Sequence, residues 1–341
     1  MDFPAWDPVI LPLWGLPIAI RWYGMMYVVG FLVGQFILVR LARRGFFPVK
    51  PEVAPDLIFY LVIGVMLGGR TGYALFYDQA LLNPLQFVQV WKGGLAFHGG
   101  LIGVAVAAWL FGRRYRIGWG RVADSCALAV TPGILAVRIA NFINGELFGR
   151  VTEKGVGWAM QFPTDPMAER LLGLSPAWTM RDRELCIQVA FGRREFAAVK
   201  DQLSSVDADG KQIVWESVKE HLDWEKVRHL TDANGNLLVP YRHPSQLYEG
   251  LGEGLVLGLV LFGLYLLTRR RPLPAGIYAA VFLLGYAAVR FSLEYVRQPD
   301  AQFGPVGTVL FGLTMGQTLS VGLVAFAVGI LAWPRRRDPA R

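Results

Sequence analysis

Long apolar segments separated by short charged loops dominate this chain of 341 residues. A helix needs about 20 predominantly apolar residues to cross a bilayer, and an isolated span must satisfy its own backbone hydrogen bonds. Seven segments approach that length, near residues 22–40, 56–77, 95–112, 122–144, 246–268, 276–296 and 316–333. We therefore expect an all-α polytopic membrane protein with seven transmembrane helices.

Residues 147–243 break this pattern, because they carry both signs of charge at similar density and no long apolar run. The segment from Asp232 to Gly235 includes an Asn-Gly pair between short apolar runs, which predicts a hairpin turn. Residues 195–203 have the period of an amphipathic helix, and residues 211–218 read as a short strand. We expect a small extramembrane head of mixed structure between spans four and five. The alternative is a spacer that contributes only to stability.

This head divides the chain into three parts. The N-terminal membrane part covers residues 1–146 with spans one to four, and the head covers residues 147–243. Residues 244–341 form the C-terminal membrane part, with spans five to seven and a basic tail. The head thus separates two groups of spans.

Composition and charge support membrane residence and give an orientation. Hydrophobic residues make up 54% of the chain and charged residues only 18%, whereas soluble domains average about 25% charged. The net charge of +8 does not indicate nucleic-acid binding, because the basic residues form short clusters beside apolar runs. The positive-inside rule places the C-terminus in the cytoplasm and the N-terminus and head outside. The clusters lie on alternate loops and the tail: Arg40, Arg43, Arg44 and Lys50; Arg113, Arg114, Arg116 and Arg121; Arg269, Arg270 and Arg271; and Arg335, Arg336, Arg337 and Arg341.

A first group of polar residues interrupts the fourth apolar segment, in the stretch VRIANFINGELFGR. Arg138 and Asn141 are three positions apart and share one helix face, with Gly149 close to it if the helix continues. Asn144 and Glu146 fall to either side of a glycine that can end the helix. An ionisable side chain at bilayer depth costs about 2.5–3.5 kcal/mol on insertion scales. If these residues only joined helices, through an Arg–Glu pair and amide hydrogen bonds, fewer polar residues would suffice. We therefore interpret the group as a binding surface.

A second group lies on the sixth apolar segment, where Tyr286, Arg290 and Glu294 follow one another at spacings of four. They form one polar stripe on a helix. An internal pair between Arg290 and Glu294 would leave the tyrosine unexplained. Arginines on two different spans indicate an anionic ligand, most simply a phosphate, because guanidinium offers planar bidentate donors and stays charged when desolvated.

His98 forms a third group, in the stretch GGLAFHGGLIGV. It is the only histidine near a span, and a lone histidine is more often structural than catalytic. The flanking glycine pairs allow close backbone approach, which favours a cavity. Imidazole titrates near neutral pH and can serve as a general base. A single histidine without cysteine or carboxylate partners at metal spacing argues against a zinc site.

Smaller groups complete the set of candidates. GGRTGYALFY contributes Arg70, and RWYGMMY contributes Tyr23 at the outer end of the first span. RHPSQLYEGLGEG places Gln246, Glu249 and Glu253 on one face at the start of the fifth span. That face either meets the substrate or forms the seam with the head.

Taken together, these stretches resemble the prolipoprotein diacylglyceryl transferase family. The resemblance is carried by RIANFINGELFGR, FHGGLIG, WYGMMY, GGRTGYALFY, RHPSQLYE and VRFSLEYVRQPDAQF, which occur in the family's order and cover nearly the whole chain outside the head. The chain departs from the family at Val137, where glycine is more frequent, and in a head longer than compact members require.

The resemblance implies a reaction in the bacterial inner membrane. The diacylglyceryl group of phosphatidylglycerol moves to the lipobox cysteine thiol of a prolipoprotein, a thioether forms, and glycerol phosphate leaves. Arg138 and Arg290 match the family's essential arginines. The other matched positions linked to activity are His98, Tyr23, Asn141, Glu146, Gly149, Tyr286 and Glu294. We expect prolipoprotein and membrane lipids as partners, and no metal or other cofactor.

The chemistry of the residues agrees with this reaction. Two arginines can hold the lipid phosphate and stabilise the charge that grows on the leaving phosphate monoester. The nucleophile belongs to the substrate, and its thiol must lose a proton because the thiolate attacks. We expect His98 as the base, with Glu146 as the alternative. Asn144 and Arg70 are further candidates for substrate binding.

Two rival functions use the same arginines. A transporter or channel for an anionic solute would have discontinuous helices in paired halves, and the sequence shows no such duplication. An enzyme acting on another lipid phosphate, such as a phosphatase or headgroup transferase, would carry a histidine nucleophile with several basic partners or acidic residues that hold a metal. The spans have one histidine and no acidic DxD-like cluster, so the diacylglyceryl transferase interpretation is preferred.

Overall fold

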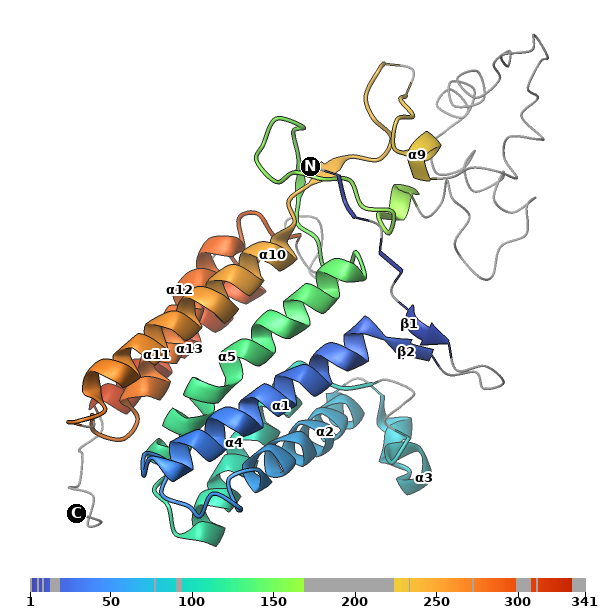
Figure 1. Ribbon diagram of the computed structural model, residues 1–341. Coiled ribbons are helices and arrows are strands. Elements are labelled where there is room, and N and C mark those ends of the chain that lie inside the picture. Colours follow the sequence, from blue (N-terminus) through green and yellow to red (C-terminus); the bar gives the residue numbers. More distant parts are fainter. Residues whose placement is uncertain are drawn as a thin grey trace. The chain divides into compact units, whose positions relative to one another are not determined.

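The computed structural model describes residues 2–4, 6–7, 9–12, 19–76, 78–89, 94–168, 224–232, 234–271, 273–298, 308–310 and 312–332. Within these ranges the chain is mostly helical, and each of the seven predicted segments contains a helix (Figure 1). The helices are α1 (Trp22–Arg43), α2 (Asp56–Phe76), α4 (Phe97–Tyr115), α5 (Trp119–Ile143), α10 (Ser245–Glu249) continuing through η3 (Gly250–Val256) into α11 (Leu257–Thr268), α12 (Ile277–Leu293) and α13 (Met315–Ala332).

The long helices have the length and composition of membrane spans. Five stretches in the described ranges are long and apolar enough to cross a bilayer, namely Trp22–Arg43, Asp56–Phe76, Trp119–Ile143, Ser245–Thr268 and Met315–Ala332. Their outer faces expose large apolar side chains, such as Phe59 at 66% and Leu267 at 85%, which a soluble protein would bury. The chain is therefore an all-α polytopic membrane protein.

The remaining described elements are short. Three antiparallel pairs of strands join β1 to β2, β3 to β4 and β5 to β6, and none of them extends into a larger sheet within the described residues. The short elements are β1 (Val9–Pro12), β2 (Ala19–Arg21), η1 (Gln79–Leu82), α3 (Pro84–Phe87), β3 (Val151–Thr152), α9 (Trp224–Val227), β4 (Tyr241–Arg242), β5 (Thr308–Leu310) and β6 (Leu313–Thr314).

The chain divides into two compact units. The membrane unit comprises residues 23–140, 248–295 and 299–341, and the loop unit comprises residues 1–22, 141–247 and 296–298. Each unit is described by itself below.

Glycines set the packing of α2 against α4 in the membrane unit (Figure 1). On α2, Gly64 and Gly68 lie where a Cβ atom would overlap the backbone of Gly103 and Gly99 of α4. Only glycine allows two helix backbones to approach this closely, and small residues four positions apart are a frequent device of membrane helix pairs. Gly99, one of the glycines that flank His98 in the sequence, therefore lies at the contact between α2 and α4.

Asp124 ties α5 to the start of α12. Its buried carboxylate accepts hydrogen bonds from the backbone N–H groups of Gly276 at 2.9 Å and Ala279 at 3.0 Å. This contact caps α12 from a neighbouring helix, which satisfies donors that would otherwise be buried without partners. Arg138 follows Asp124 by 14 positions on α5, and Arg290 follows Gly276 by 14 positions on α12. Each interval is a rise of about 21 Å along its helix. The cap therefore brings the two arginines to the same level.

In the loop unit, Arg242 joins several segments. Its guanidinium pairs with Asp165, donates to Gln298 Oε1 at 2.5 Å, and lies 4.9 Å above the Phe148 ring. The predicted turn at Asp232–Gly235 is present: Asp232 accepts from the Asn234 and Asn236 backbone N–H groups. The predicted helix at 195–203 and strand at 211–218 lie outside the described residues.

Candidate functional site

Arg138 and Arg290, on two helices of the membrane unit, each lie close to glutamate carboxylates of that unit. Arg138 on α5 places Nη1 2.8 Å from Glu249 Oε2 and Nη2 3.7 Å from Glu253 Oε2. Arg290 on α12 places Nη1 2.7 Å from Glu294 Oε2 and 3.9 Å from Glu249 Oε1. Glu249 thus lies between the two guanidiniums. We call these five residues the Arg–Glu cluster.

A π-helix supplies one side of this cluster. η3 spans Gly250–Val256, immediately after Glu249, and its wider turn interrupts an otherwise α-helical span. Segments of π-helix are rare and are often found at functional sites. A Cβ atom at Gly250 would lie 3.1 Å from Arg138 Cβ, and one at Gly254 would lie 2.7 Å from Leu135 Cβ. Both glycines therefore let η3 approach α5 where Arg138 projects.

The polar stripe predicted on α12 is present, because Tyr286 and Arg290 belong to one regular helix and Glu294 is its C-cap. Tyr286 lies within electrostatic range of Glu253, Glu249 and both arginines. Gly316 on α13 borders the cluster, since a Cβ atom there would lie 2.5 Å from Glu294 Oε2 and 2.9 Å from Arg290 Nη2. The sequence therefore placed these α12 residues together correctly.

The loop unit holds the asparagines and Glu146. Asn141 donates from Nδ2 to Glu146 Oε1 at 2.9 Å, and Asn144 donates to the same oxygen at 3.3 Å. Helix α5 ends at Ile143, and Gly145 has φ +66°, as expected for a glycine that ends a helix. Glu146 is exposed, while Asn141 is buried. The two amides therefore orient one carboxylate toward solvent.

Gly149 has a backbone role in the same unit. Its N–H donates to the His243 carbonyl at 2.7 Å, and it pairs with Arg297 in an antiparallel bridge. A side chain at Gly149 would overlap the Val296 carbonyl oxygen. Glycine is thus required for chain packing at this position.

Arg70 contacts the backbone of the segment that precedes α4. Its guanidinium donates to the carbonyl oxygens of Gln86 at 2.6 Å, Phe87 at 3.0 Å, and Gln89 and Gly94 at 3.3 Å each. The side chain is among the most fully buried in the described chain. A guanidinium with this many backbone acceptors fixes a loop, which is a structural task not foreseen from the sequence.

His98 and Tyr23 are placed at helix starts. His98 is the second residue of α4, and its side chain lies outside the described residues. Tyr23 is the second residue of α1, is exposed, and its hydroxyl lies 3.3 Å from that of Tyr27.

Sequence reasoning left Glu249 and Glu253 without an assigned role, although it placed them on one face of the fifth span. The sequence feature that could have indicated a role is their spacing of four residues on a span that otherwise carries no charge. Within the described residues, no group of three His, Cys, Asp or Glu side chains is arranged to hold a metal ion.

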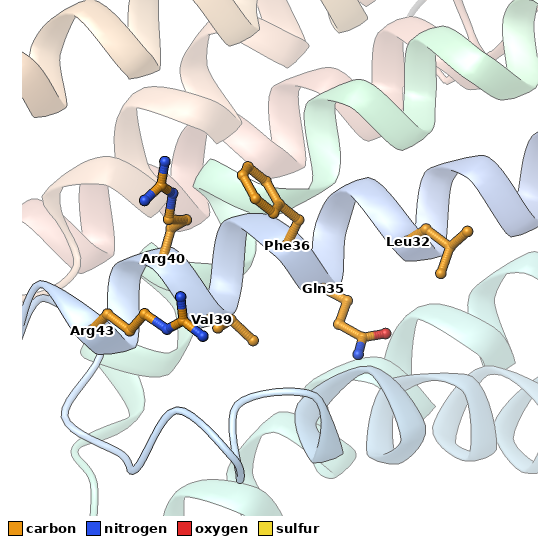
Figure 2. A pocket seen from close by; sticks show the side chains of 6 residues that line it. All are labelled: Leu32, Gln35, Phe36, Val39, Arg40 and Arg43. Atoms are coloured by element: carbon orange, nitrogen blue, oxygen red, sulfur yellow. The ribbon is translucent and has the colours of Figure 1, made fainter.

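A separate hollow lies on the surface of α1, with a volume of about 550 Å³. Figure 2 shows Phe36 and Arg40 on one side of the helix and Gln35 on the other. Its lining residues are Leu32, Gln35, Phe36, Val39, Arg40 and Arg43. All six residues belong to α1, and none belongs to the Arg–Glu cluster. The hollow is therefore part of the α1 surface and is not the candidate site.

Comparisons with known proteins agree on one family. The family model of prolipoprotein diacylglyceryl transferase matches residues 8–333. A phosphatidylglycerol–prolipoprotein diacylglyceryl transferase of Burkholderia multivorans is 36% identical, covering 98% of this chain and 96% of its own length. The enzymes of the same name from Paraburkholderia xenovorans and Paraburkholderia phymatum are 36% and 37% identical, covering 99% and 98% of this chain and 97% and 95% of their own lengths. This chain belongs to the prolipoprotein diacylglyceryl transferase family.

Proposed function

We propose that this protein transfers the diacylglyceryl group of phosphatidylglycerol to the lipobox cysteine thiol of prolipoproteins. A thioether forms and glycerol phosphate is released, the first step of bacterial lipoprotein maturation. Family membership and the names of the relatives support this assignment. The structural observation that carries it is the pair of half-buried arginines, Arg138 and Arg290, that share the buried Glu249 carboxylate.

The arginines are proposed to hold the lipid phosphate. Each guanidinium retains donors beyond those directed at its carboxylate partner, and a bidentate pair with phosphate is among the strongest hydrogen-bonded interactions. When the carbon–oxygen bond to phosphate breaks, negative charge grows on the departing phosphate monoester. Positive groups fixed in a site of low dielectric stabilise that charge more than water does. Arg138 and Arg290 are therefore the proposed catalytic arginines.

The remaining candidates receive roles around this phosphate site. His98 is proposed to take the proton of the substrate thiol, and Glu146 is the alternative base because its carboxylate is exposed and held by two amides. Tyr286 and Glu294 are proposed to border the bound lipid. Further proposed contacts of the substrate are Tyr23, Asn141, Asn144, Gly149 and Arg70.

The same proposal includes a topology. We place the protein in the bacterial inner membrane with seven spans, adding α4 and α12 to the five stretches identified by length and apolarity. Helix α4 has 19 residues, a length of about 28 Å. The head at 147–243 and the N-terminus are proposed to lie in the periplasm, and the C-terminus in the cytoplasm. Asn234→Cys and Arg270→Cys, each introduced into protein whose native Cys126 and Cys186 are replaced by serine, test this orientation by labelling with a membrane-impermeant maleimide. Only Asn234→Cys should react in intact cells.

Purified protein, phosphatidylglycerol and a synthetic lipobox peptide provide the direct test of the reaction. Mass spectrometry should show the peptide gaining one diacylglyceryl group, with glycerol phosphate released in equal amount. A peptide with serine in place of the lipobox cysteine is the matched control and should gain nothing. An unchanged mass of the cysteine peptide would refute the assignment.

His98→Gln should lower turnover and shift the acidic limb of the pH–rate profile, because the proposed base is lost.

A further inference from the structure

The turn that follows α5 carries a bulky residue in a left-handed backbone conformation. Leu147 has φ +58°, a region that disfavours side chains with a Cβ atom and is an outlier for bulky ones. Its side chain is 49% exposed, so burial of that side chain does not explain the conformation. Strained residues persist only where their surroundings fix them, and they gather at functional sites. The conformation of Leu147 therefore needs a cause other than core packing.

Three side chains fix the backbone of this turn. Each of the three consecutive carbonyl oxygens of residues 145–147 accepts one hydrogen bond from a side chain. The donors are Thr164 Oγ1 to Gly145, Gln246 Nε2 to Glu146 at 2.7 Å, and Ser245 Oγ to Leu147 at 2.9 Å. Ser245 and Gln246 are both fully buried. The turn is thus rigid, and this rigidity holds Leu147 at its positive φ.

The end of α5 shows what the turn presents to the surface. It is a Schellman motif, in which the Glu146 N–H donates to the Asn141 carbonyl oxygen and the Gly145 N–H to that of Phe142, both at 2.9 Å. Such a motif frequently places an apolar residue at the Glu146 position, in contact with the last helical turn. Here the residue is charged, and Asn141 Nδ2 donates to its Oε1 instead. The motif therefore holds an exposed carboxylate next to the exposed Leu147.

The two exposed side chains favour a peptide over a lipid headgroup as their ligand. Asn141 and Asn144 both donate to Glu146 Oε1, so Oε2 is left to accept from a ligand in the part of the chain that the structure describes. A headgroup that carries a phosphate is anionic, and the carboxylate repels it. A peptide offers backbone N–H donors and apolar side chains, and a signal peptide is apolar before its processing site.

We propose that Leu147 is a specificity residue for the prolipoprotein and contacts an apolar side chain of its signal peptide. The proposal rests on the proposed function and adds to it a residue that recognises the peptide. It also accounts for the strain. Glycine or asparagine adopts a positive φ more readily, but neither supplies an apolar contact of this size.

Peptide binding tests this role without turnover. The probe is a fluorescein-labelled lipobox peptide with serine in place of cysteine, and its anisotropy is followed with protein in detergent and without added phosphatidylglycerol. Leu147→Asn keeps a residue that tolerates the turn, and its Kd should rise about tenfold because a leucine contact is lost. Leu147→Met keeps an apolar side chain and should stay within about twofold of the wild type. An unchanged Kd in Leu147→Asn would overturn the proposal.

Val156→Asn is the matched control, because it replaces another exposed apolar residue of the loop unit, at 40% exposed. It should bind the serine peptide as the wild type does. An equal loss of affinity in Val156→Asn and Leu147→Asn would contradict a specific contact at Leu147. If Leu147→Asn does not insert, Leu147→Gly takes its place, with the same expected rise in Kd.

Stability and kinetics distinguish this role from a structural one. Leu147→Asn relieves a strained conformation, so its Tm should equal or exceed that of the wild type, whereas loss of a packing residue lowers Tm. A lower Tm would overturn the proposal. KM for the cysteine peptide should rise about tenfold, with KM for phosphatidylglycerol unchanged. A rise confined to phosphatidylglycerol would overturn the proposal in favour of a lipid contact.

The proposed function and this proposal fail in different ways. A wild type that binds the serine peptide through Leu147 but leaves the cysteine peptide unmodified would refute the transfer reaction and support the peptide contact. A wild type that modifies the cysteine peptide, with no change of KM or Kd in Leu147→Asn, would support the reaction and refute the contact.

Discussion

Arg138 and Glu249 form a close ion pair, with 2.8 Å between Nη1 and Oε2, at the position where an α-helical span changes to a π-helix. Glu249 also approaches Arg290 at 3.9 Å, so one carboxylate links arginines from two helices. Breaking a buried ion pair by removing one partner is strongly destabilising, because the other charge remains uncompensated. The pair therefore holds both guanidiniums in place.

The first prediction concerns the two arginines. Arg138→Ala and Arg290→Ala should each lower turnover by about 100-fold or more, the cost of removing a group that stabilises transition-state charge. Arg138→Lys should recover little of it, since lysine lacks the planar fork that binds a carboxylate and a phosphate together. Transfer to a lipobox peptide, measured on protein whose insertion is verified, checks this. Arg40→Ala, an exposed arginine at the end of α1, is the control and should retain activity.

The second prediction uses two glycines of α13. Gly316→Ala places a methyl group 2.5 Å from Glu294 Oε2 and 2.9 Å from Arg290 Nη2, so these side-chain ends must move. Turnover should fall by about tenfold, because a displacement of about 1 Å in a catalytic group has effects of that order or larger. A Cβ atom at Gly322 on the same helix meets nothing within 4 Å. Equal activity of Gly316→Ala and Gly322→Ala would argue against a functional position for the Arg290–Glu294 pair.

Part of this site could be predicted from the sequence. Tyr286, Arg290 and Glu294 follow one helical period, so their common face was evident without a structure. The partners of Arg138 were not evident, because Glu249 and Glu253 lie far along the chain and spacing within one helix says nothing about contacts between helices. The π-helix that begins after Glu249 and contains Glu253 has no compositional signature that separates it from an α-helix.

The backbone contacts of Arg70 could not be predicted from the sequence. Its stretch, GGRTGYALFY, made Arg70 a candidate for substrate binding, a role that stays a prediction, and its guanidinium donates to backbone carbonyl oxygens of four residues. Backbone acceptors cannot be recognised from the residue types in a sequence, because every residue carries a carbonyl group. The turn glycine at Gly145 was predictable, since its task depends on its own conformational freedom.

The third prediction concerns the crossing of α2 and α4. A Cβ atom at Gly103 would overlap the Gly64 carbonyl oxygen, whereas one at Gly100 of the same helix meets Val65 at 3.8 Å, an ordinary contact. Gly103→Ala should destabilise the protein by about 1–3 kcal/mol, as overpacking commonly does. Thermal unfolding in detergent should show a lower Tm for Gly103→Ala and little change for Gly100→Ala. Equal Tm values for the two variants would contradict the crossing.

The fourth prediction distinguishes loop fixing from substrate binding at Arg70. Arg70→Lys keeps the charge but cannot reach four carbonyl oxygens with one ammonium group. Hydrogen exchange of the amides at 84–89 and 94–96 should accelerate, and turnover should fall by about tenfold, because α4 begins at the end of this segment. Arg113→Lys, an exposed arginine near the other end of α4, should change neither quantity. Lost turnover with unchanged exchange would instead favour a direct contact with substrate.

The last prediction is a pH dependence of the loop unit. Burial lowers the pKa of the His243 imidazole below its ordinary value of 6.5. The folded protein therefore binds a proton at this residue less readily than the unfolded chain does. Its contribution to stability is fully present above about pH 6.5 and is lost as pH falls through the lower folded pKa. His243 also forms the backbone bridge to Gly149 and Arg150, so protonation acts on a packed segment.

Hydrogen exchange of residues 148–165, followed between about pH 8 and about pH 5 after correction for the intrinsic exchange rate, measures this loss. Protection should decline toward the acidic end in the wild type. His243→Gln should flatten the dependence, because the glutamine has no proton to gain in this range. His229→Gln replaces an exposed histidine of the same unit and should retain the wild-type slope. A slope that persists in His243→Gln would assign the pH response to another group.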